Sequence, residues 1–140
     1  MSLKMSVDER EEFLAGVHIG IVSIPRQDKG PLAVPIWYDY EPGGEVTMIT
    51  NKSSIKGRLL DSAERISLCA QTETAPYSYV SIEGPFQTTG TSPEELLSMA
   101  IRYLGEEQGK IYAASSDNSD DSIMVRINPE SWLTVDYSKS

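Results

Sequence analysis

ITNKSSIKGRLL, residues 49–60, is a cationic and hydroxyl-rich segment in an acidic chain. From Thr50 to Arg58 it carries two lysines, one arginine and no acidic residue, although the whole chain has a net charge of −9. Apolar and polar residues alternate before it, at 45–50, as they do in a strand. Residues 50–56, which we call the elbow, are therefore expected to lead from the end of that strand into the next element.

A helix is expected directly after the elbow. Ile55, Leu59 and Leu60 recur at helical spacing, and Ser53 or Ser54 is placed to cap the helix, which should end near residue 62. Unpaired N–H groups at a helix start, hydroxyl groups and a lysine ammonium can together bind one anion. The elbow is thus a candidate phosphate site, and a capped surface helix with solvated lysines is the alternative interpretation.

Working outward from the elbow, most of the chain has strand character. Helices are expected at 7–14, 92–105 and, less regularly, 106–115, and strands at 17–24, 31–40, 45–50, 65–71, 77–90, 121–128 and 131–137. Pro35 should restrict its strand to an edge or a bulge, and the strand at 77–90 should bend at 84–85. This pattern predicts a single α+β domain, 1–140, that is mainly β: six or more mostly antiparallel strands, closed into a barrel, with two or three flanking helices.

Composition excludes several classes of function. Cys69 is the single cysteine and His18 the single histidine, so an internal disulfide and a Cys/His zinc site are excluded, and no metal is expected. An isoelectric point near 4.5 argues against nucleic acid as a partner. No apolar run is long enough to cross a membrane and the first residues are charged, so we expect a cytoplasmic protein.

Four other features have a structural and a functional interpretation. Trp37, on the strand interrupted by Pro35, could wall a planar ring or anchor a core or dimer contact. Tyr77 and Tyr79 share one strand face and could pack or line a substrate pocket. The remaining features are expected to be structural: His18 hydrogen-bonded, Cys69 a buried inert thiol, and the acidic loop 117–121 solvated, because it lacks the glycine and glutamate of a calcium loop.

The order of these motifs resembles the split-barrel flavin-binding superfamily that includes pyridoxamine 5'-phosphate oxidase. The likeness runs from about 13 to 137 and is carried by Thr50-Asn51-x-x-Ser54-x-Lys56-Gly57, by Val80-Ser81-Ile82-Glu83-Gly84 and by the closing Trp132-x-x-x-Asp136-Tyr137. It implies an FMN-binding split barrel that forms a homodimer with the ring between protomers. It also implies that the cofactor is FMN or the deazaflavin coenzyme F-420, and that a hydride passes to a small organic acceptor. The residues that inherit cofactor contacts are Val34, Pro35, Ile36, Trp37, Thr50, Asn51, Lys52, Ser54 and Lys56.

The chain also departs from the oxidase pattern. An adjacent basic pair of the oxidase is replaced by Ile55-Lys56, an arginine or lysine is absent from the strand at 34–37, and an Arg-Gln pair is replaced by Ser78-Tyr79. A reductase is therefore favoured over a pyridoxamine phosphate oxidase. Two alternatives remain open: a non-catalytic module that sequesters FMN, haem or a tetrapyrrole, for which His18 is the one axial-ligand candidate, and a ligand-free structural dimer.

Overall fold

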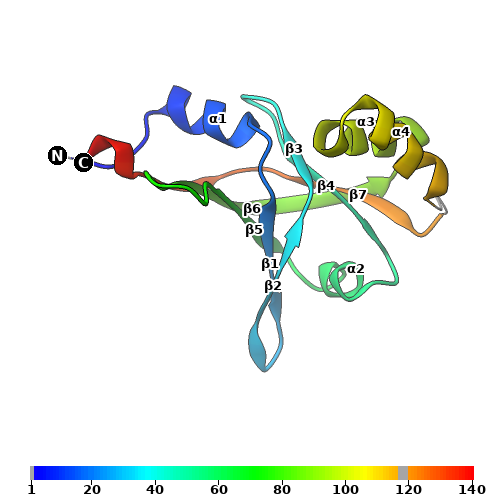
Figure 1. Cartoon of the computed structure of the whole chain (residues 1–140). Coiled ribbons are helices and arrows are strands. Elements are labelled where there is room, and N and C mark those ends of the chain that lie inside the picture. The colour runs from blue at the N-terminus through cyan, green and yellow to red at the C-terminus, as the bar shows by residue number, and fades with distance from the viewer. Residues whose placement is uncertain (1, 117–119) are drawn as a thin grey trace.

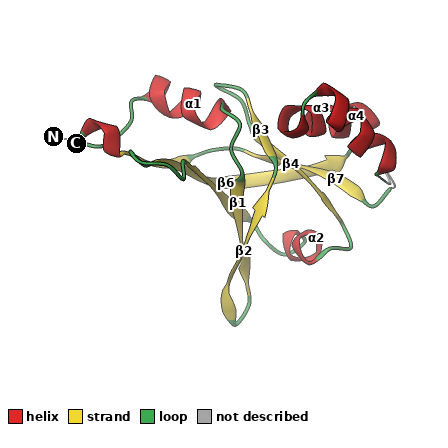
Figure 2. Ribbon diagram, in the orientation of Figure 1, coloured by secondary structure: helices red, strands yellow, loops and turns green. Residues whose placement is uncertain are grey.

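The computed structural model describes residues 2–116 and 120–140, and within them the chain forms an antiparallel sheet flanked by helices (Figures 1 and 2). The helices are α1 (Val7–Ala15), α2 (Ile55–Leu60), α3 (Pro93–Leu104) and α4 (Glu106–Ser115), followed by the 3-10 turn η1 (Tyr137–Lys139). The strands are β1 (Gly20–Arg26), β2 (Lys29–Ile36), β3 (Tyr38–Tyr40), β4 (Val46–Asn51), β5 (Arg65–Gln71), β6 (Ser78–Gly90), β7 (Ser122–Ile127) and β8 (Ser131–Asp136). None of the described helices is long and apolar enough to span a bilayer.

Short-range capping sets the helix starts, as the sequence predicts. Ser6 and Glu9 form a reciprocal capping box at α1, and Ser92 and Glu95 form a second one at α3. Gly105 ends α3 with a φ of 84°, a backbone conformation that favours glycine. The weakly periodic segment after it is also a helix, so four α-helices flank the sheet rather than two or three.

The sheet is one antiparallel path that curves around a single core. Its strand order is β2-β1-β5-β6-β7-β4-β3, and β8 pairs with β6 outside that path. Strand β6 belongs to both halves: residues 78–85 pair with β5 and β8, whereas residues 86–90 pair with β7. The two halves meet at the expected bend, where a Cβ on Gly84 would overlap the carbonyl oxygen of Asn128.

The core lies inside this curve. One residue in two along β1, β4, β5 and the first half of β6 points inward and is fully or almost fully buried, among them Val22, Met48, Leu68 and Ile82, whereas nearly every residue of β7 is buried. This alternation confirms the mainly β, α+β architecture. Figure 1 shows α1 at one end of the sheet beside the chain termini, α3 with α4 at the other end, and α2 beneath the β4–β7 side.

Two expected boundaries are wrong. The strand expected at 17–24 begins only at Gly20, because His18 is bonded to α1 and α3 rather than to a neighbouring strand. The turn expected at 25–30 is shorter, since β1 runs to Arg26 and β2 starts at Lys29, with Asp28 at a φ of 62°.

The strand expected at 31–40 breaks at residue 37 rather than at Pro35. Pro35 remains in register opposite Ile21, and β2 is an edge strand, where a proline is tolerated. The break separates β2 from β3 and occurs because the backbone of Tyr38 bonds to side chains of α3, as described below.

Candidate functional site

The elbow forms the expected junction between β4 and α2. Ser54, rather than Ser53, caps α2: its Oγ accepts from the Gly57 N–H at 3.0 Å and donates to the carbonyl oxygen of Asn51 at 2.6 Å. The Thr50 hydroxyl lies 3.3 Å from the same Oγ. The structure therefore brings Thr50, Asn51 and Ser54 together, as the sequence predicts, but it uses the Ser54 hydroxyl to fix the turn.

Gly57 lets the helix approach the elbow closely. A Cβ at this position would overlap the carbonyl oxygen of Asn51 and lie 2.6 Å from that of Lys52. Side chains essentially never tolerate such contacts with backbone atoms. The glycine after Lys56 is thus required by packing, and it lets the start of α2 lie directly against the end of β4.

The fold also brings one carboxylate to the elbow. Asp121 lies at the start of β7, and its side chain accepts from the Ser53 N–H at 3.2 Å and from the Ser53 hydroxyl at 2.7 Å. Its carbonyl oxygen accepts from the Lys52 N–H at 2.7 Å. The elbow is therefore acid-free in sequence but not in space. The rest of the expected acidic loop, 117–119, lies outside the described residues.

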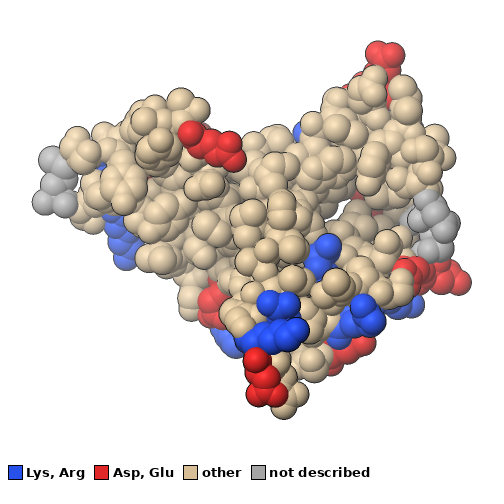
Figure 3. All heavy atoms as spheres, turned by 60° about the horizontal axis from the view of Figure 1, so that its bottom comes forward, with Lys and Arg blue, Asp and Glu red and all other residues tan. Residues whose placement is uncertain are grey.

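The cations around the elbow have no acidic partner among residues 2–116 and 120–140. Lys52, Lys56 and Arg58 take part in none of the ion pairs found there. Lys56 is half-buried, whereas Lys52 and Arg58 are exposed. Figure 3 shows Lys and Arg side chains gathered on the face that carries α2 and the β1–β2 hairpin.

An apolar cavity lies on the outward face of β4 and is lined by Ile49, the residue before the elbow, although no residue of the elbow itself lines it. Its volume is about 300 Å³. The residues that line it come from β2, from the break after β2, and from β4, α3 and α4: Pro35, Ile36, Trp37, Ile49, Leu96, Met99 and Tyr112. Three of the four residues expected along a ring therefore meet in one cavity, whereas Val34 is not among its lining residues and packs against the core.

Trp37 packs against two tyrosines, one on α3 and one on α4. Its ring stacks on Tyr103 with centroids 5.0 Å apart and an interplanar angle of 6°, and it lies 5.3 Å from the ring of Tyr112. Both interpretations of Trp37 thus have support, because it packs against aromatic neighbours and also lines the cavity.

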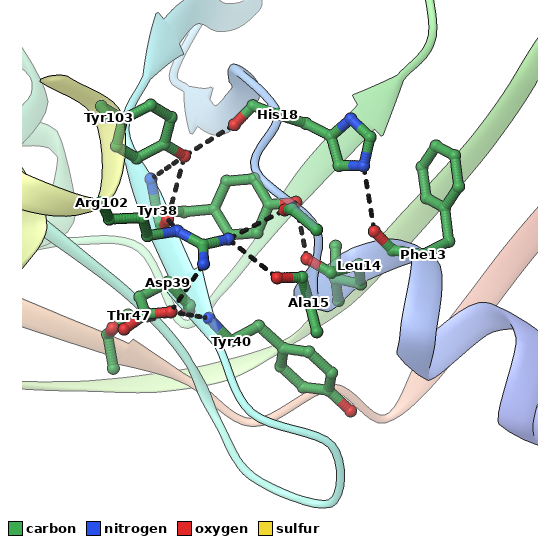
Figure 4. Close-up of polar contacts among 11 residues, drawn as sticks. Phe13, Leu14, Ala15, His18, Tyr38, Asp39, Tyr40, Thr47, Arg102 and Tyr103 are labelled. Atoms are coloured by element: carbon green, nitrogen blue, oxygen red, sulfur yellow. Dashed lines mark hydrogen bonds and ion pairs between the residues drawn. The ribbon is translucent and has the colours of Figure 1, made fainter. Parts of the chain in front are cut away.

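Arg102 and Tyr103 of α3 satisfy the backbone where the sheet breaks (Figure 4). The Tyr103 hydroxyl accepts from the Tyr38 N–H at 2.9 Å and lies 2.6 Å from the carbonyl oxygen of His18. The Arg102 guanidinium donates to the carbonyl oxygens of Tyr38 and Gly16, at 2.9 and 2.8 Å. These contacts fix the cavity wall on β2 and β3 relative to α3.

Burial keeps the two hydroxyls of this network protonated. Desolvation raises the pKa of both Tyr38 and Tyr103 above the ordinary tyrosine value. The Tyr38 hydroxyl can therefore donate to the carbonyl oxygen of Leu14 at 2.7 Å throughout the physiological range. Sequence reasoning missed this network. The one available signal is the adjacent Arg102-Tyr103 pair near the end of an amphipathic helix, and its partners are 64 or more residues away.

The two candidate substrate residues lie elsewhere in the chain. Tyr79 pairs with Gln71 and Val135 at the start of β6, and Tyr77 is 53% exposed beside η1. Gly90, at the far end of β6, pairs with Ile123 of β7, and Ile123 pairs in turn with Thr50 of the elbow. At about 3.3 Å per residue, Tyr79 and Gly90 are on the order of 30 Å apart along β6. Within one chain these tyrosines do not line the elbow or the apolar cavity.

The single histidine and the single cysteine have ordinary structural environments. The His18 Nε2 lies 3.0 Å from the carbonyl oxygen of Phe13, and its ring stacks on the Phe13 ring. Burial lowers the pKa of His18. Cys69 is only half-buried, less than expected, and burial raises the pKa of its thiol. The described residues contain no group of three or more His, Cys, Asp or Glu that could hold a metal ion.

Solved structures with the same fold include proteins named for flavin-type cofactors. A conserved hypothetical protein, Rv2991, from Mycobacterium tuberculosis superposes with a TM-score of 0.78 and 24% identity, covering 99% of this chain and 89% of that one. A structure named F420 reductase superposes with a TM-score of 0.73 and 18% identity, covering 88% of this chain and 94% of that one. An FAD- and haem-binding protein from Mycobacterium smegmatis superposes with a TM-score of 0.68 and 15% identity, covering 95% of this chain and 72% of that one. These likenesses confirm the split-barrel fold.

A family model identifies the chain more directly. No curated protein sequence matches it closely. The model described as pyridoxamine 5'-phosphate oxidase matches residues 6–136, which is nearly the whole chain and contains the elbow, the cavity and β8. The chain therefore belongs to the pyridoxamine 5'-phosphate oxidase family of split-barrel proteins.

Proposed function

We propose that this chain is an oxidoreductase that binds FMN or the deazaflavin coenzyme F-420 at a homodimer interface and passes a hydride to a small, mostly apolar organic acceptor. The observation that carries the proposal is that the apolar cavity and the elbow adjoin on β4, where the residue that lines the cavity is followed directly by the first residue of the elbow. Ile49 lines the cavity, and the elbow begins at Thr50. A ligand with a planar ring and a phosphoryl group needs such a pair of adjoining sites.

The dimensions and the charges of the two sites support this arrangement. Ile49 and Asn51 share the outward face of β4 and lie about 7 Å apart along the strand. The cavity of about 300 Å³ is at the small end of ligand pockets, which suits a ring better than a whole dinucleotide. Lys56 and Lys52 would supply charge-assisted hydrogen bonds to the phosphoryl oxygens, with Asn51, Ser54 and Thr50 completing the polar wall.

The residues of the chain would bind and orient the cofactor rather than exchange protons. When bound, a flavin or deazaflavin supplies the hydride chemistry itself. Trp37, held by Tyr103 and Tyr112, would wall one side of the ring. Pro35 lies on edge strand β2, whose outer backbone groups are unpaired in the sheet and could face the ring edge. The apolar lining would exclude water from the reacting atoms.

The position of the remaining cations bears on which cofactor is bound. Arg26 and Lys29 lie on the β1–β2 hairpin, and α2 packs against β1. Together with Lys52 and Arg58 they could accommodate the polyglutamate tail of the deazaflavin coenzyme, whereas FMN would leave Arg26, Lys29 and Arg58 in solvent. Replacing Arg26, Lys29 and Arg58 by neutral residues should therefore weaken binding of the deazaflavin coenzyme more than binding of FMN.

Direct titration tests the proposal. Purified chain is titrated with FMN and, separately, with coenzyme F-420, following the fluorescence of the cofactor. We expect saturable binding of at least one of them and a large loss of affinity in Lys56→Ala. Lys110→Ala is the matched control, since Lys110 lies on α4 in an exposed pair with Glu106. Failure of both cofactors to bind would refute the proposal.

A non-catalytic carrier of the same cofactor is the second candidate, because the described site contains no acid–base pair beside the cavity. It differs from the enzyme in one measurable respect: the bound, reduced cofactor would not be reoxidised by small organic acceptors under anaerobic conditions.

Haem is tested separately by adding it to the purified chain, and appearance of a haem absorbance band that is lost in His18→Ala would favour the sequestering module.

A further inference from the structure

One carboxylate faces the elbow, and the pairing of β4 with β7 holds it there. Asp121 directly precedes β7, where Ser122 pairs with Asn51. The Lys52 N–H donates to the Asp121 carbonyl oxygen at 2.7 Å and so extends this pairing by one residue. The Asp121 carboxylate then lies on Ser53, whose N–H donates to Oδ1 at 3.2 Å and whose hydroxyl donates to Oδ2 at 2.7 Å. Its negative charge is therefore a fixed part of the elbow.

The cations of the elbow are few. Lys52 and Lys56 are the two that it contains. Arg58 lies two residues beyond Lys56 on α2, and at about 100° per residue its side chain projects from nearly the opposite side of the helix. Lys52 also lines a cavity of about 350 Å³ together with Asp61, so a second acidic residue lies beside it. Two lysines and the Asp121 carboxylate give the elbow a net charge of +1, against +2 from its own residues alone.

The other groups of the elbow that can bind a ligand are neutral. The Ser122 hydroxyl donates to the Asn51 side-chain oxygen at 3.3 Å, which turns the N–H₂ end of this amide away from Ser122. The Thr50 hydroxyl lies beside Ser54. Neutral donors of this kind bind a phosphoryl oxygen whether the group carries one negative charge or two. Discrimination between such groups therefore depends on the charged residues, among which Asp121 is the acid in contact with the elbow.

The number of negative charges on a phosphoryl group depends on its ester bonds. A phosphomonoester such as FMN has a second pKa of about 6, so it carries close to two negative charges above neutral pH. The phosphodiester of coenzyme F-420 has no second proton to lose and carries one. Because the energy between two charges is proportional to each of them, a carboxylate repels the monoester about twice as strongly as the diester.

We propose that Asp121 biases the elbow toward a phosphodiester and against a phosphomonoester, and so toward coenzyme F-420 rather than FMN. This inference rests on the proposed function and distinguishes between its two cofactors. Two unit charges about 6 Å apart, the scale of neighbouring side chains, change an affinity roughly 3-fold in bulk water and roughly 100-fold at the effective dielectric constant of a protein surface. Asp121 is half-buried, so we expect an effect between these limits, about 10-fold for each charge on the ligand.

Removal of the charge alone tests this selection. Asp121→Asn keeps an oxygen that accepts from the Ser53 N–H and an amide group that bonds to the Ser53 hydroxyl, so it neutralises the carboxylate without removing its contacts. Asp8→Asn is the matched control, since Asp8 is exposed on α1, which lies well away from α2 (Figure 1). The affinities of FMN, of the methyl ester of its phosphate and of coenzyme F-420 are measured by cofactor fluorescence at about pH 8, where FMN is doubly charged.

The ratio of the FMN affinity to the methyl ester affinity is the decisive quantity. We expect this ratio to rise about 10-fold in Asp121→Asn and to stay unchanged in Asp8→Asn, while coenzyme F-420 gains about as much affinity as the methyl ester. A ratio in Asp121→Asn within about 2-fold of the parent ratio, or an equal change in Asp8→Asn, would overturn the proposal. Failure of all three cofactors to bind would refute the proposed function, whereas binding with an unchanged ratio would refute this inference alone.

Discussion

Replacing Arg102 by Met should destabilise the fold more than replacing any exposed arginine. Arg102 is only 15% exposed and donates to the carbonyl oxygens of Tyr38, Ala15 and Gly16, at 2.9, 3.2 and 2.8 Å. Its guanidinium also lies 3.3 Å from the Asp39 carboxylate. Methionine keeps the aliphatic stem but leaves these acceptors without their donor.

The magnitude follows from the number and burial of these contacts. A hydrogen bond from a charged group contributes about 1.5–3 kcal/mol, and breaking a buried charged network costs about 3–5 kcal/mol. Because water can reach Asp39, which is 41% exposed, we expect a loss of about 3–4 kcal/mol. An unfolding entropy of about 2.1 cal/mol/K per residue converts this loss into a fall in Tm of roughly 10–14 °C.

Urea unfolding followed by circular dichroism measures this loss. The control is Arg65→Met, since Arg65 also makes several bonds, to Glu83 and Glu130, but is 47% exposed. Its midpoint should stay close to that of the parent, because the three side chains are 37–47% exposed and Glu83 and Glu130 stay solvated when Arg65 is removed. An Arg102→Met variant within about 1 kcal/mol of the parent, or an equal loss in Arg65→Met, would refute the assignment of Arg102 as the group that joins α3 to the break in the sheet.

Three further predictions concern the elbow and α3. Lys56→Ala should weaken cofactor binding by about 1.5–3 kcal/mol, or roughly 10- to 150-fold, in a fluorescence titration; unchanged affinity would exclude Lys56 from the site. Gly57→Ala should destabilise the chain by about 2 kcal/mol or more in urea unfolding, because its Cβ overlaps the Asn51 carbonyl oxygen; a neutral result would mean that α2 can shift freely. The pKa of Glu95 is lowered, chiefly by the Ser92 N–H and further by Arg126, so its contribution to stability is complete above the ordinary value of 4.5 and is lost as the pH falls through the lowered value. The stability difference between the parent and Glu95→Gln should therefore be constant near neutral pH and vanish in acid, and a difference that persists in strong acid would contradict this origin.

Local sequence signals predicted the helices and most strands correctly. Ser6 with Glu9 and Ser92 with Glu95 mark helix starts within four residues, and both capping boxes are present. The strand at 65–71 and the bend near Gly84 follow from alternation and from a glycine–proline pair. These features are predictable because each depends on neighbours in sequence.

Features that depend on distant residues were not predictable in the same way. The break in the strand at residue 37 depends on Tyr103, 65 residues from Tyr38. The carboxylate at the elbow comes from Asp121, 68 residues from Ser53. The elbow and the ring contacts at 34–37 were predicted from separate motifs, and the cavity that brings Ile49, the residue before the elbow, together with Pro35, Ile36 and Trp37 emerged only from the fold.

Comparison of each cofactor with its form that lacks the phosphoryl group tests the central claim most directly. The affinities of FMN and riboflavin, and of coenzyme F-420 and its dephosphorylated chromophore, are measured for the parent chain and for Lys56→Ala. If the elbow holds the phosphoryl group, the parent will bind the phosphorylated member of one pair at least 10-fold more tightly, and Lys56→Ala will lose most of that preference. Equal affinity of the parent for both members of each pair would contradict the assignment of the elbow as the phosphate site.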